Sequence, residues 1–173
     1  MDTGETEVTQ AAVGDGRKGL ALAYRYINRR ERTVVEVRER LERAEIPHSE
    51  IESVLAELIE FGYLDDARYA RVFTQDKRGL EGWGNERIAR SLGERGVDRD
   101  LVAGALAEGM GALAEGEPAG ETGRAIAVLA HRFPAGPAEP RDRERAFGVL
   151  VRKGYESETA ADAVREWARQ AAV

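Results

Sequence analysis

The chain contains no cysteine, which excludes disulfide bonds and thiolate metal ligands. His48 and His131 are its only histidines, and neither has partners at a spacing that suits a zinc site or a general base. No apolar run approaches the roughly 20 residues of a membrane span. The first 18 residues lack the apolar segment of a secretory signal. These absences predict a soluble, cytoplasmic protein with no metal, no cofactor and no membrane contact.

Motifs for nucleotide binding and catalysis are missing as well. Gly82-Trp83-Gly84 lacks the third glycine of a dinucleotide-binding loop, and no strand is predicted before it. Asp65 and Asp66 form a pair of carboxylates, but no histidine or further acid stands at a supporting spacing. Their place at the start of a helix predicts capping of that helix instead. We therefore expect a protein that is not an enzyme.

Helical periodicity dominates the rest of the chain, and three segments share one apolar pattern. Each segment predicts a helix, a tight turn and a second helix, and a further helix precedes each pair. The pattern comprises Val37, Leu41, Ile46, Ile51, Val54 and Leu55, then Ile88, Leu92, Val97, Val102, Ala105 and Leu106, then Ala146, Leu150, Tyr155, Ala160, Ala163 and Val164. The predicted fold is all-α and elongated, with three tandem three-helix repeat units that pack on their neighbours in series.

Glycine and proline clusters indicate where these units begin and end. The predicted organisation is a disordered tail at 1–18, repeats at 19–62, 63–110 and 121–173, a Gly-rich linker at 111–120 and a Pro-rich insert at 134–140 within the last repeat. Gly96 and Gly154 stand where a left-handed residue would end the middle helix of a repeat. The turns of the second and third repeats are therefore predicted to be alike.

Three helix starts also have sequence signals. Thr33 with Glu36 has the spacing of a capping box, and so has Ser49 with Glu52. Asn85 is placed to cap the helix that follows it. These residues predict where the second and third helices of the first repeat begin, and where the second helix of the second repeat begins.

The second repeat carries the predicted binding surface. From Arg68 to Arg95 there are seven Lys or Arg residues against four Asp or Glu residues, in a chain of net charge −6. The candidate partner-binding residues are Arg68, Arg71, Lys77, Arg78, Trp83, Arg87, Arg90 and Arg95. The alternative is a solvated face whose cations complement helix ends. Trp83 is either an exposed anchor for a partner or a loop tryptophan folded over the core.

One long motif in this region resembles the core motif of the RecX family of recombination regulators. It runs from Gly62-Tyr63-Leu64-Asp65-Asp66-Ala67-Arg68-Tyr69-Ala70 through Phe73, Asp76-Lys77-Arg78, Gly82-Trp83-Gly84, Arg87-Ile88 and Leu92 to Arg95-Gly96-Val97. The resemblance covers residues 19–110, whereas 121–173 match the family by apolar pattern only.

The resemblance implies a non-enzymatic regulator of RecA recombinase that lies in the groove of the RecA filament. Such a protein inhibits filament extension, ATP hydrolysis and strand exchange, and so modulates DNA repair, DNA recombination and the SOS response. We expect a monomer that binds RecA-coated single-stranded DNA tightly and free DNA weakly. The alternative is a helical protein that binds DNA directly. Its contacts would be to phosphates, because the acidic last helices of the first two repeats are poorly suited to reading bases. A structural adaptor for another partner is a third interpretation.

Overall fold

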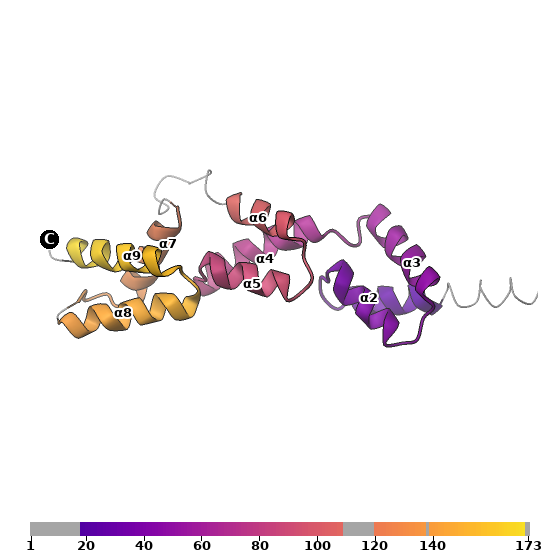
Figure 1. Ribbon diagram of the computed structural model, residues 1–173, viewed down its shortest axis with the longest axis horizontal. Coiled ribbons are helices and arrows are strands. Elements are labelled where there is room, and N and C mark those ends of the chain that lie inside the picture. The colour runs from indigo at the N-terminus through magenta and orange to yellow at the C-terminus, as the bar shows by residue number, and fades with distance from the viewer. Residues whose placement is uncertain (1–17, 109–119, 138, 172–173) are drawn as a thin grey trace, which may run out of the picture. The chain divides into compact units, whose positions relative to one another are not determined.

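A computed structural model describes residues 18–108, 120–137 and 139–171. Within these ranges all regular secondary structure is helical, as Figure 1 shows. The predicted tail and Gly-rich linker lie outside the described residues, apart from Lys18 and Gly120. Both of these residues belong to helices.

The helices follow one another in threes, with the labels of Figure 1. The first repeat comprises the helix at 18–27, α2 (Val34–Glu42) and α3 (His48–Glu60). The second comprises α4 (Asp66–Glu81), α5 (Asn85–Gly93) and α6 (Arg99–Ala107). The third comprises α7 (Gly120–Arg132), α8 (Pro140–Lys153) and α9 (Ser157–Gln170). The all-α repeat class is confirmed, and Pro140, expected in the insert, is the first residue of α8.

Internal contacts divide the chain into two compact units. Unit 1 holds the first repeat, the start of α4 up to Tyr69, and the turn Arg95–Val97. Unit 2 holds the segment Ala70–Glu94 and the chain from Asp98 onwards. The second repeat therefore contributes residues to both units.

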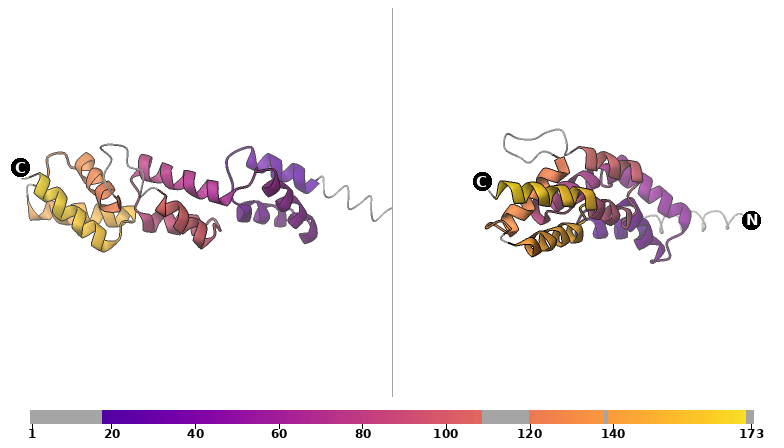
Figure 2. Two further views of the ribbon diagram at one scale, coloured as in Figure 1. Left: turned by 90° about the horizontal axis from the view of Figure 1, so that it is seen from above. Right: turned by 60° about the vertical axis from the view of Figure 1, so that its left-hand side comes forward.

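Each unit has its own apolar core. The core of unit 1 includes Leu41, Leu58 and Leu64. In unit 2, α9 lies against both α7 and α8 (Figure 2), and this packing buries Tyr155 and Trp167. Of the aligned apolar residues predicted from the sequence, all are buried except Leu106, which is half-buried. Burial of the shared positions explains why the hydrophobic pattern repeats while surface residues differ.

The turn after the middle helix of each repeat has a left-handed residue at the same place. The φ angle is +58° at Glu45, +74° at Gly96 and +84° at Gly154. The prediction for the two glycines is confirmed. In the first repeat a glutamate takes this conformation, which costs a residue with a Cβ atom about 1 kcal/mol.

Glu45→Gly is expected to stabilise unit 1 by about 0.5–1 kcal/mol, because glycine adopts the left-handed conformation without steric cost. Glu39→Gly, on an exposed position inside α2, should instead lose about 1 kcal/mol of stability. Thermal unfolding followed by circular dichroism measures both changes. A lower melting temperature for the Glu45 variant would contradict the strain that we assign to this turn.

Two of the predicted caps are present. Thr33 Oγ1 accepts a hydrogen bond from the backbone N–H of Glu36 at 3.2 Å, and the Glu36 carboxylate accepts one from the backbone N–H of Thr33 at 3.1 Å. This reciprocal pair is the predicted capping box of α2. Asp65 Oδ1 accepts from the backbone N–H of Arg68 at 2.8 Å, so Asp65 caps α4 as expected.

Two other predicted caps are wrong. Helix α3 begins at His48 directly after Pro47, which places Ser49 inside the helix and leaves no side-chain cap. Helix α5 begins at Asn85 itself, with Gly84 at the capping position. The sequence spacing placed the start of α3 two residues late and the start of α5 one residue late, because a proline and a tertiary contact fix where these helices begin.

Candidate partner-binding surface

Trp83 lies in unit 2 between the end of α4 and the start of α5. Its backbone N–H donates to the carbonyl of Lys77 at 3.0 Å, which closes the last turn of α4. The Arg87 guanidinium lies 3.9 Å from the centre of the indole ring, and the Lys77 ammonium lies 4.9 Å from it. The ring is half-buried and meets Phe73 edge-on. It is thus neither a fully exposed anchor nor a core residue, but an aromatic surface that holds two cations.

An open groove of about 620 Å³ runs beside this tryptophan. Its lining residues are Trp83, Arg87, Arg90, Ser91, Glu94 and Arg152. Arg152 comes from the end of α8, and its carbonyl accepts a hydrogen bond from Arg87 Nη1 at 3.3 Å. Three arginines face one glutamate here, so the groove favours an anionic ligand.

Backbone contact between two glycines brings α8 to this groove. The N–H of Gly84 donates to the Lys153 carbonyl at 2.9 Å, and the N–H of Glu86 donates to the Gly154 carbonyl at 3.2 Å. A Cβ atom on Gly84 would lie 2.2 Å from the Gly154 oxygen, and one on Gly154 would lie 2.2 Å from the Arg87 Cβ. Only glycine fits at either place.

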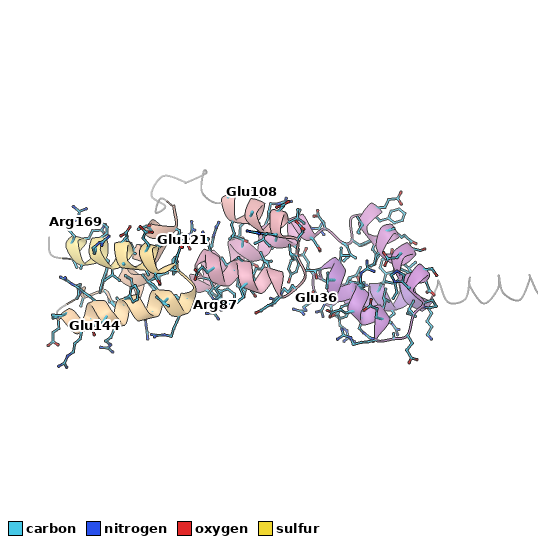
Figure 3. The ribbon with its side chains drawn as sticks, viewed as in Figure 1. Glu36, Arg87, Glu108, Glu121, Glu144 and Arg169 are labelled. Carbon is cyan, nitrogen blue, oxygen red and sulfur yellow. The ribbon has the colours of Figure 1, made fainter. Side chains whose placement is uncertain are left out.

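A polar cluster lies next to these glycines, around the start of α7. Glu121 accepts hydrogen bonds from the Asn85 backbone N–H at 2.7 Å and from Asn85 Nδ2 at 2.6 Å. Figure 3 labels Glu121 on α7 and Arg87 on α5. Arg78 Nη2 donates to Asn85 Oδ1 at 2.8 Å and to the Leu106 carbonyl at 2.7 Å. Burial lowers the pKa of Arg78, and the charge of Arg124 lowers it further.

The Arg78 guanidinium therefore binds acceptors within its own repeat, although the sequence analysis predicted it on the partner-binding surface. Burial raises the pKa of the Tyr155 hydroxyl to about 12, although the charge of Arg124 opposes this shift. No hydrogen-bond partner among the described residues reaches the Tyr155 hydroxyl, Arg78 Nε or Arg124 Nε. The physical role of this cluster is to join α4, α5 and α7.

The other predicted site residues lie at different places. Arg71 pairs with Glu108 at 3.7 Å in unit 2. Arg68 belongs to unit 1, where it pairs with Glu31 at 3.6 Å. Arg95 also belongs to unit 1. The structure thus brings Trp83, Lys77, Arg87 and Arg90 together.

Arg152 was missed by the sequence analysis, which confined the surface to the second repeat. The sequence contains a signal that could have indicated Arg152 as a surface residue of the site, because Arg152 directly precedes the Lys153-Gly154-Tyr155 turn. That turn aligns with Arg95-Gly96-Val97 in the shared pattern. The direct backbone contact of this turn with α5 could not be foreseen from the alignment.

Unit 1 contains a corresponding contact, in which side chains bond to the backbone. Asp66 Oδ1 accepts from the N–H of Val34, the first residue of α2, at 3.0 Å. Thr33 Oγ1 donates to the Arg95 carbonyl at 2.7 Å. A Cβ atom on Gly96 would lie 2.5 Å from that of Val35. Burial raises the pKa of Asp66, so this acid serves a contact between repeats, beyond the capping of its own helix that was predicted.

The described residues contain no group of three or more His, Asp or Glu side chains that could hold a metal ion. Among the helices described, none combines the length and the apolar character needed to cross a membrane.

The fold and the groove define a class of protein: an all-helical chain of tandem three-helix repeats with an arginine-lined surface. Two family models match this chain. One, described as the first three-helix domain of RecX, covers residues 20–58, and the other, described as the second three-helix domain of RecX, covers 65–106. The chain belongs to the RecX family.

Curated relatives and solved structures agree with this assignment. A regulatory protein RecX from Thermobifida fusca is 34% identical over 152 residues, covering 86% of this chain and 78% of the relative. One from Deinococcus radiodurans is 33% identical over 147 residues, covering 85% and 67%. The crystal structure of RecX from Lactobacillus salivarius has a TM-score of 0.74 at 20% identity, covering 90% of this chain and 97% of that one. This last likeness concerns the fold alone, and the relatives' names give the chain a regulatory role.

Proposed function

We propose that this protein is a non-enzymatic regulator that binds RecA and its nucleoprotein filament. It inhibits filament extension, ATP hydrolysis and strand exchange, and so modulates recombination, DNA repair and the SOS response. The observation that carries the proposal is the match of both three-helix domains to RecX. The protein acts as a monomer in the cytoplasm, on RecA-coated single-stranded DNA.

The contact surface in this proposal is the groove beside Trp83. Arg90 is exposed and has no ion pair with any residue that the structure describes, so its charge is available to a partner. Arg152 is exposed as well. Arg87 is held by the indole ring and by a backbone carbonyl, which fixes the direction of its guanidinium. Guanidinium groups bind carboxylates in a two-pronged geometry, so acidic side chains on the partner are the expected contacts.

The test is the rate of RecA-catalysed ATP hydrolysis on single-stranded DNA at increasing concentrations of this protein. The wild-type chain should lower the rate. Arg90→Gln with Arg152→Gln should raise the concentration for half-inhibition about tenfold, equivalent to about 1.4 kcal/mol of binding free energy. Neither residue supports the fold, so helical content should remain unchanged.

The matched control is Arg165→Gln with Arg169→Gln. These arginines are exposed on α9 and pair with Asp162 and Glu166, so the change in net charge is the same. The control should shift half-inhibition less than twofold. Equal shifts for the two variants would remove the groove from the contact surface. An unchanged ATPase rate with wild-type protein would overturn the proposed function itself.

A further inference from the structure

A second arginine groove lies in unit 1, and none of the predicted site residues lines it. It is an open groove of about 220 Å³ between the first helix, the turn after it, and α2. Its lining residues are Leu22, Arg25, Tyr26, Arg29 and Arg40. Three of these five side chains are cationic, and no acidic residue lines the groove among those described.

The three arginines of this groove differ from their neighbours in having no acidic partner. Arg25, Arg29 and Arg40 form no ion pair with any residue in the described part of the chain. The arginines around them are paired: Arg30 and Arg32 with Glu36, Arg38 with Glu52, and Arg43 with Glu39. Three unpaired ones that converge on one groove create a local positive potential.

The arrangement suits an anionic chain better than a single anion. Arg25 lies on the first helix, Arg29 lies in the turn after it, and Arg40 lines the same groove from α2. Each guanidinium can hold a phosphate through two parallel hydrogen bonds. Tyr26 lies in the groove under the Arg32 guanidinium, which is 3.9 Å from its ring centre. Arginines beside an aromatic ring are typical of sites that follow a single nucleic-acid strand.

A protein partner fits this groove less well. Protein interfaces depend on apolar anchors that become fully desolvated in a pocket. Here the apolar lining is Leu22 and Tyr26, and both side chains are already half-buried in unit 1. We infer that the groove of Arg25, Arg29 and Arg40 binds the phosphates of single-stranded nucleic acid. This site is separate from the groove beside Trp83, and its existence does not depend on RecA binding.

The experiment is a titration of fluorescein-labelled oligo(dT) with the full chain, followed by fluorescence anisotropy at several salt concentrations. The triple variant Arg25→Gln, Arg29→Gln, Arg40→Gln should bind at least tenfold more weakly at about 50 mM salt. Each phosphate contact on a single strand contributes about 0.7 to the slope of log K against log salt. Loss of three contacts should therefore reduce the slope by about 2.

The matched control is Arg43→Gln, Arg165→Gln, Arg169→Gln, which removes the same charge from exposed, paired arginines. It should keep at least half of the wild-type affinity, and circular dichroism should show native helical content for both variants. An equal loss in the control would mean that net charge alone decides binding, and the site would be rejected. Tighter binding of a labelled oligo-glutamate peptide than of oligo(dT) would also reject it, in favour of an acidic protein partner. No RecA is present, so either failure leaves the proposed function standing.

Discussion

Replacing Gly154 with alanine is expected to destabilise unit 2 by about 4 kcal/mol. The new Cβ atom would lie 2.2 Å from Arg87 Cβ and 2.7 Å from the Arg87 backbone nitrogen. The neighbour on one side is backbone, which cannot move aside as the end of a flexible side chain can. The φ angle of +84° adds about 1–2 kcal/mol of backbone strain, and overpacking of such a contact adds typically 1–3 kcal/mol.

Urea unfolding followed by tryptophan fluorescence measures this loss. The two tryptophans of the chain, Trp83 and Trp167, both lie in unit 2, so the signal reports on that unit. Gly104→Ala is the control, because Gly104 is exposed inside α6 and a Cβ atom there meets nothing within 4 Å. Alanine should stabilise that helix by up to about 1 kcal/mol. If both variants unfold at the wild-type urea concentration, the contact between the Gly154 turn and α5 is not needed for stability.

The second large effect is expected for Glu121→Ala, a loss of about 3 kcal/mol. The Glu121 carboxylate accepts two hydrogen bonds from Asn85, at the positive end of the α5 dipole. Arg78 and Arg124 are the cations of the same cluster. Removing the carboxylate leaves two partly buried Asn85 donors without their acceptor and takes a negative charge away from Arg78 and Arg124, which costs more than one neutral hydrogen bond.

Glu121→Gln separates the two contributions, since glutamine keeps an acceptor oxygen but carries no charge. It should lose about 1 kcal/mol in the same unfolding assay. Glu144→Ala is the surface control, because Glu144 is exposed on α8 (Figure 3) and should change stability by less than about 0.5 kcal/mol. An alanine variant at 121 as stable as this control would show that the polar cluster does not join α5 to α7.

Much of the fold could be predicted from the sequence because apolar spacing sets which residues are buried. The three aligned patterns predict the core, and Leu106 alone among them is only half-buried. The left-handed turns at Gly96 and Gly154 follow from residue type. The starts of α3 and α5 could not be predicted in the same way. Capping spacing is a local signal, and at Asn85 a distant acid, Glu121, takes the place of a local cap.

Less of the candidate site than of the fold could be predicted from the sequence. Charge clustering predicts a basic region, but it does not predict which arginines bind groups inside the protein. Arg78 is one of these, because it donates to the Leu106 carbonyl. Two features lay outside the predicted surface: Arg152, which comes from another repeat, and the arginines of the first repeat, which include Arg40. Whether a charge is free depends on the acids around it in three dimensions, and a count along the chain does not contain that information.

Residue order alone fixed the helical class, the threefold recurrence and the buried positions, because each depends on periodicity within about 20 neighbouring residues. The folded chain settled which repeats touch and through which atoms. Gly84 meets Gly154 across 70 residues, and Asn85 meets Glu121 across 36. Those contacts depend on surfaces that exist only once the helices have packed, and they decide which arginines remain open to a partner.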